Sequence, residues 1–95
     1  MNKYELVVIV DANLSQEEKE TVQKEICDGI VRCEGKVINS QVWIDKQKMP
    51  FRIKRSTEGT YFLFNFECMR PALTKLRQIL RLNEKVLRSL IIKVE

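Results

Sequence analysis

The chain has 95 residues, of which 44% are hydrophobic and 32% are charged, and its formal net charge is +4. These values are typical of one folded domain, expected here to span residues 1–95, and they exclude a largely disordered chain. No apolar run approaches the roughly 20 residues of a membrane-spanning helix. The N-terminus also lacks the pattern of a secretory signal, so we expect no membrane partner.

Charge is distributed unevenly along the chain. Residues 1–34 hold eight acids and four cations, a net charge of −4, whereas residues 35–95 hold five acids and thirteen cations, a net charge of +8. This asymmetry favours a polyanionic partner for the C-terminal part, although solvated basic faces are also common.

The first predicted element is a strand over residues 4–10, whose even-numbered side chains point inward. Val7 and Ile9 then share the open face with Glu5. Two large aliphatic side chains on such a face would be explained by a docking partner, and equally by partial cover from the same sheet.

A loop over residues 11–14 leads into a predicted helix that begins at Ser15. Ser15 and Glu18 form a capping box, and Gly35 is expected to stop the helix. The apolar residues between them follow helical spacing: Val22, Ile26, Ile30 and Cys33.

A long extended segment is predicted over residues 36–54. Pro50 interrupts it, which favours an edge strand or a bulge. Residues 56–59 have the composition of a turn, and residues 60–68 alternate as a strand.

The aromatic residues of that strand divide between its two faces. Phe62, Phe64 and Phe66 share one face, which we expect to be core. Tyr61 and Leu63 occupy the other face, together with polar residues.

A second helix is predicted to begin at Pro71 and to end at Asn83, expected to be left-handed. Its buried stripe is Leu73, Leu76, Ile79 and Leu80. The last strand, residues 86–94, is apolar on both faces, which fits a buried, central or partner-covered position.

The predicted element order is therefore βαββαβ. Two helices on one face of a four-stranded antiparallel sheet form an α+β architecture, the ferredoxin-like fold.

Residues that would support catalysis are missing from the sequence. There is no histidine and no glycine-rich phosphate loop, and the loop at 11–14 has no cation to bind an anionic substrate. The three cysteines fit no metal-binding spacing, so we expect them to be reduced core residues. We therefore expect no enzyme activity, no small-molecule substrate and no cofactor.

An RNA-recognition motif has the same element order and stacks bases on aromatics of its third strand. In residues 58–65 Gly59 and Phe62 match that pattern, whereas Glu58, Thr60 and Asn65 do not. We therefore expect no base-stacking platform. A stand-alone RNA-recognition-type module and a protein-interaction domain remain the alternatives.

Five segments occur in an order and spacing that resemble one known family. They are Lys3-Tyr4-Glu5, Gly35, Trp43 followed by Met49-Pro50-Phe51-Arg52-Ile53, Gly59-Thr60-Tyr61-Phe62-Leu63, and residues 80–88, LRLNEKVLR. Over essentially its whole length the chain resembles the bacterial-type small-subunit ribosomal protein six family. It departs from the family pattern at Ile44, where glycine is common, and in the position of Pro50.

The resemblance implies a structural component of the small ribosomal subunit. Such a protein would bind the central domain of small-subunit ribosomal RNA as a heterodimer with ribosomal protein eighteen, on a cytoplasmic or organellar ribosome. The implied RNA-binding cations are Lys3, Lys46, Lys48, Arg52, Arg81, Lys85 and Arg88.

Arg81 and Arg88 are the first candidates among these cations, because they flank the turn before the last strand and guanidinium groups suit phosphates. A solvated helix end is the alternative interpretation. The expected partner-binding residues are Val7, Ile9, Trp43, Tyr61 and Leu63. Trp43 fits a core position equally well.

Overall fold

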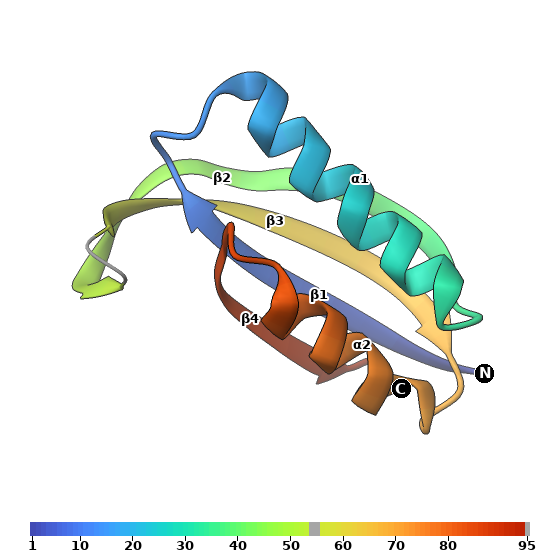
Figure 1. Cartoon of the computed structure of the whole chain (residues 1–95). Coiled ribbons are helices and arrows are strands. Elements are labelled where there is room, and N and C mark those ends of the chain that lie inside the picture. Colours follow the sequence, from blue (N-terminus) through green and yellow to red (C-terminus); the bar gives the residue numbers. More distant parts are fainter. Residues whose placement is uncertain (54–55, 95) are drawn as a thin grey trace.

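The computed structural model describes residues 1–53 and 56–94, and the side chains of all of these except residues 50–53. The elements in chain order are β1 (Asn2–Asp11), α1 (Gln16–Arg32), β2 (Lys36–Ile53), β3 (Ser56–Cys68), α2 (Ala72–Leu82) and β4 (Val86–Lys93). Figure 1 shows both helices on one face of the sheet. The predicted ferredoxin-like fold is confirmed.

The strands are antiparallel and lie in the order β2-β3-β1-β4, so β2 and β4 form the two edges. Of the three positions predicted for the last strand, the structure excludes the buried and the central one, and the partner-covered position stays a prediction. β4 is an edge strand, and Leu90 and Ile92 remain 57% and 47% exposed. Its apolar residues on the open side are not covered by the rest of the chain.

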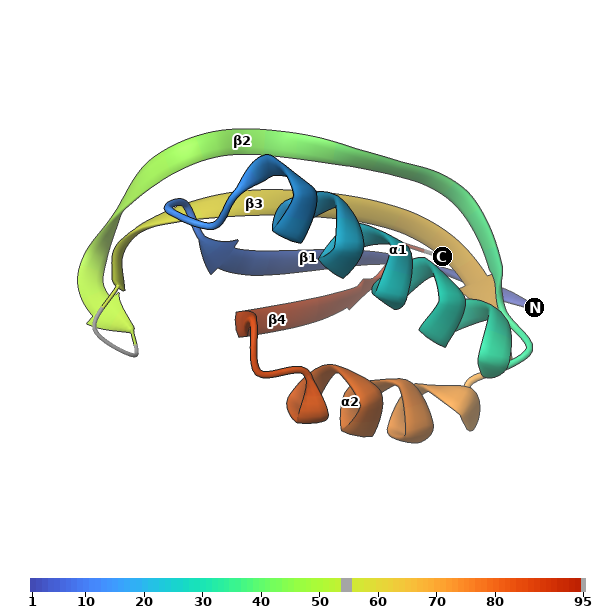
Figure 2. The ribbon, with the colours of Figure 1, turned by 45° about the horizontal axis from the view of Figure 1, so that its top comes forward.

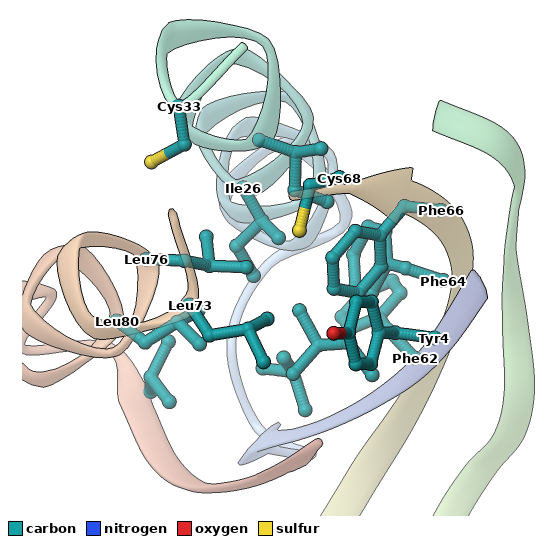
Figure 3. Close-up of a cluster of buried hydrophobic side chains, with 14 of the residues drawn as sticks. Tyr4, Ile26, Cys33, Phe62, Phe64, Phe66, Cys68, Leu73, Leu76 and Leu80 are labelled. Carbon is teal, nitrogen blue, oxygen red and sulfur yellow. The ribbon is translucent and has the colours of Figure 1, made fainter. Parts of the chain in front are cut away.

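The core fills the space between the helices and the inner face of the sheet. Phe62, Phe64 and Phe66 are at most 1% exposed, which confirms their predicted core position. Tyr4 stacks on Phe66 with 5.6 Å between the ring centroids. In Figure 3 these rings point toward Ile26 of α1 and toward the leucines of α2. Alternation in β1 and β3 thus leaves one sheet face open.

Helix α1 begins as predicted. The backbone N–H of Glu18 donates to the Ser15 hydroxyl oxygen, and the Ser15 N–H donates to the Glu18 carboxylate, each at 3.1 Å. The helix ends at Arg32, shortly before Gly35, and the left-handed residue at this end is Glu34, with a φ of 63°, rather than the glycine. Gly35 is needed for space instead: a Cβ there would lie 2.8 Å from Cγ2 of Ile30.

Residues 56–59 are strand rather than the predicted turn. They pair with the end of β2, and Gly59 also stands opposite Asp11 of β1. Glycine suits this position because a Cβ would lie 2.7 Å from Cγ2 of Ile9. Figure 2 shows that β2, at the edge of the sheet, is strongly curved. This curvature is consistent with the register shifts that interrupt its pairing with β3.

Helix α2 buries Leu73, Leu76 and Leu80, whereas Ile79 is only partly buried. The predicted left-handed Asn83 was wrong, because its φ and ψ are −82° and 108°. Its side chain caps the following turn instead: the carboxamide oxygen accepts from the Lys85 backbone N–H at 3.1 Å.

Candidate nucleic-acid interface

The predicted RNA-binding cations lie in separate regions of the molecule. Lys3 lies at the start of β1, opposite Glu67. Lys46 and Lys48 are exposed on the edge strand β2, near its far end. The side chain of Arg52 lies outside the described side chains. The structure therefore does not gather these cations into one patch.

Arg81 and Arg88 lie on opposite sides of the sheet. Arg81 is exposed in the last turn of α2, on the helix side. Arg88 stands opposite Ile9 in register, and Ile9 belongs to the open face of β1. The two first candidates are close in sequence. Because side chains alternate between the faces of a strand, however, Arg88 points to the open face, away from Arg81.

Lys85 is already engaged with α1. Its ammonium lies 3.8 Å from the Glu18 carboxylate. The hydrogen bond from the Ser15 backbone N–H is the main cause that lowers the pKa of Glu18, and the Lys85 charge contributes less. A phosphate at Lys85 would therefore compete with a structural contact.

Three cations that sequence reasoning missed lie near Arg81. Arg70 and Lys93 line one hollow between α2 and β4, and Arg77 lines both this hollow and an adjoining one that includes Arg81. The spacing of Arg77 and Arg81, at i and i+4, could have indicated a common face of α2, whereas Arg70 lies in the turn before the helix.

The open sheet face carries the other predicted set. Val7 pairs with Leu63 and Ile9 with Tyr61, and all four are partly buried. The row of Val7 and Leu63 continues to Leu90 on β4, which sequence reasoning missed because the register of that strand was ambiguous.

Trp43 lies at an irregularity in the edge strand. It is the extra residue between the pairs of Val42 with Phe62 and of Ile44 with Tyr61. Its 54% exposure excludes a core position. The interface-anchor interpretation of Trp43 thus stays a prediction.

The described residues include few groups that could bind a metal ion or take part in a reaction. Among them no group of three acidic or cysteine side chains is arranged to hold a metal ion. Cys33 and Cys68 are buried free thiols, and burial, followed by the nearby Cys33, raises the pKa of Cys68. Within residues 1–53 and 56–94, no helix has the length and apolar character needed to cross a membrane.

These features define a ferredoxin-like domain with a basic strip beside one helix and an apolar patch on its open sheet face. The family model for ribosomal protein S6 matches residues 3–93. The chain belongs to the ribosomal protein S6 family, which confirms the predicted family and a structural, non-enzymatic role in the small ribosomal subunit.

Individual relatives match over nearly the whole chain. The small ribosomal subunit protein bS6 of Dictyoglomus turgidum is 34% identical over 95 residues, which cover 100% of this chain and 97% of that protein. The bS6 protein of Azobacteroides pseudotrichonymphae is 41% identical over 91 residues, covering 95% and 80%. The crystal structure of 30S ribosomal protein S6 from Thermotoga maritima has a TM-score of 0.88 at 25% identity, covering 97% of this chain and 86% of that one.

Proposed function

We propose that the protein, acting as one domain over residues 1–95, binds the central domain of small-subunit ribosomal RNA as a heterodimer with ribosomal protein eighteen. The observation that carries this proposal is the family match along residues 3–93, in a chain whose residues 35–95 carry a net charge of +8. Because phosphate contacts release counterions, binding should weaken steeply with salt.

The RNA-contacting residues in this proposal are the seven predicted cations, with Arg81 first among them. Arg81 is exposed and projects from a helix end, and none of the ion pairs between described residues involves it, so its guanidinium can reach a phosphate without losing such a contact. Lys85 is a weaker candidate, since its ammonium already contacts Glu18.

The partner-contacting surface in this proposal is the open face of β1, β3 and β4. Val7 and Leu63 are partly buried there, and Leu90 and Ile92 extend the apolar surface toward the edge strand. Continuous exposed apolar surface of this kind is typical of a protein interface. Trp43, exposed on β2, would contribute at the rim.

The test is a reconstitution with purified components. The protein, ribosomal protein eighteen and a transcript of the central domain of small-subunit ribosomal RNA are mixed, and binding is measured by filter retention from low to high salt. We expect a ternary complex whose affinity falls steeply with salt. No complex at low salt, or an affinity independent of salt, would refute the proposal.

A further inference from the structure

A hollow strip runs along the seam between α2 and the edge strand β4. Two adjoining hollows of about 430 and 260 Å³ make up this strip, and Arg77 and Ile91 line both of them. We call it the α2–β4 groove. Its polar side chains are Arg70, Thr74, Arg77, Arg81, Ser89 and Lys93, together with the edge of the buried Tyr4.

The helix wall of the groove is a row of arginines. Arg77 and Arg81 lie one turn apart on α2, and Arg70 lies in the turn that precedes this helix. Leu73 and Leu80, on the adjoining stripe, are buried and hold this side of α2 against the core. The arginines are thus fixed along the rim while their guanidinium groups stay exposed.

The strand wall comes from the inner face of β4. Ser89 and Lys93 pair with Val8 and Tyr4, whose side chains point into the core. They therefore lie on the helix-covered side of the sheet, yet both are exposed because β4 is an edge strand. Lys93 in this way faces the same hollow as Arg70 and Arg77.

The charges in the groove are all of one sign. No acid among the described residues lines either hollow, and residues 70–82 contain four cations and no acid. Within the described part of the chain, the ion pairs involve Lys19 and Lys85 and none of the four groove cations. Clustered cations repel one another in the free protein, and a bound polyanion would relieve this repulsion.

The chemistry of the lining favours a sugar-phosphate backbone. Guanidinium forks and hydroxyl groups bind phosphate oxygens, and the groove exposes no aromatic ring on which a base could stack, because Tyr4 is 3% exposed. An acidic protein segment would also meet the charge requirement, but a protein interface needs apolar anchors. Such anchors lie on the open sheet face, at Leu90 and Ile92.

We propose that the α2–β4 groove binds an RNA phosphodiester backbone through Arg70, Arg77, Arg81 and Lys93, independently of base sequence. The inference rests on the proposed function and adds a site to it. The groove lies on the helix side of the sheet, opposite the apolar patch of the open face. RNA and a protein partner can therefore occupy the molecule at the same time.

The experiment compares a groove variant with a variant matched in charge. Arg77→Gln with Arg81→Gln removes two groove cations, and Lys24→Gln with Lys75→Gln removes two exposed helix cations that do not line the groove. Each is titrated with the central-domain transcript in the presence of ribosomal protein eighteen. We expect the groove variant to bind about tenfold more weakly near 0.1 M salt, with the slope of log K against log salt reduced by about 2.

The control variant should change affinity by less than about twofold, because its charges lie away from the bound backbone. A second groove pair, Arg70→Gln with Lys93→Gln, provides an independent test if the first variant is misfolded by circular dichroism. Wild-type affinity and slope in a folded groove variant would overturn the inference and remove Arg81 from the proposed RNA contacts, whereas RNA binding by the heterodimer itself would stand. Loss of heterodimer formation alone would also overturn it, and absence of RNA binding by the wild type would refute both.

Discussion

Thr60, whose side chain is fully buried, donates a 2.9 Å hydrogen bond to the carboxylate of Asp45 on the neighbouring strand β2. The ammonium of Lys19 in α1 lies 3.4 Å from the same carboxylate oxygen. The contact sits beside Lys46, which has a φ of 65°, where the pairing of β2 and β3 shifts register. One exposed carboxylate therefore satisfies a buried hydroxyl and joins a helix to two strands.

This contact predicts a specific loss of stability in acid. The Thr60 hydrogen bond, and after it the Lys19 charge, hold the pKa of Asp45 below its ordinary value of 3.8. The stability that the carboxylate contributes is therefore fully present above its unfolded pKa and is lost as the pH falls through the folded pKa. Asp45→Asn should make the free energy of unfolding less dependent on pH below about pH 4.

Urea unfolding from about pH 6 to pH 2 measures this dependence. Glu18, whose pKa is also lowered, remains in both proteins, so its contribution cancels in the comparison. The same acid dependence in wild type and Asp45→Asn would show that Thr60 and Lys19 do not stabilise the ionised carboxylate.

Two glycines should respond differently to alanine. In Gly35→Ala the new Cβ would lie 2.9 Å from the carbonyl oxygen of Ile30 and 3.1 Å from that of Glu67, and backbone atoms cannot easily move aside. We expect a loss of roughly 1–3 kcal/mol in the free energy of unfolding. Gly29→Ala meets only side-chain atoms of Ile79, the nearest at 3.1 Å, and gains helix propensity of up to about 1 kcal/mol.

Chemical denaturation of the two variants measures this difference, and Gly29→Ala should lie close to wild type. Equal destabilisation of both proteins would mean that the side chain of Ile79 cannot move aside at Gly29 either, and would contradict the expected difference between side-chain and backbone contacts.

Substitutions in β3 can distinguish a structural role of its aromatic residues from a role in base stacking. Phe62 is 1% exposed, so Phe62→Ala should cost roughly 3–5 kcal/mol as a core truncation. Tyr61, partly buried on the open face, is the matched neighbour, and Tyr61→Ala should be much less destabilising. RNA binding by folded Tyr61→Ala, measured by filter retention, should stay near the wild-type value. A large loss there would favour the RNA-recognition-type alternative.

The apolar patch of the open face predicts which substitution should weaken binding of the protein partner. Leu90→Asn changes a side chain that is 57% exposed, so the fold should tolerate it while the affinity for ribosomal protein eighteen falls by tenfold or more, about 1.4 kcal/mol. Val42→Asn is the control, because Val42 is also exposed at 46% but pairs with Phe62, whose side chain points into the core.

Isothermal titration with the purified partner distinguishes these two variants. If Val42→Asn weakens the heterodimer and Leu90→Asn does not, the partner binds along the edge strand β2, where Trp43 is exposed, and not on the open face.

Local patterns along the chain were sufficient for the element order, the capping box at Ser15 and the core stripe of phenylalanines. These features depend on residues a few positions apart, so hydrophobic periodicity and side-chain caps encode them directly. The helix and strand ends were less predictable. Glu34 rather than Gly35 has the left-handed conformation after α1, and the space at Gly35 is limited by Ile30 and by Glu67 from a distant strand.

The sequence by itself thus determined the fold class, the family and the basic character of the C-terminal part. Only the tertiary structure decided which cations act together. Register places Arg88 on the open face with Ile9, whereas the edge position of β4 brings Lys93 beside Arg70 and Arg77. Pairing between strands and packing of a helix on an edge strand join residues far apart in the chain, and no local periodicity encodes them.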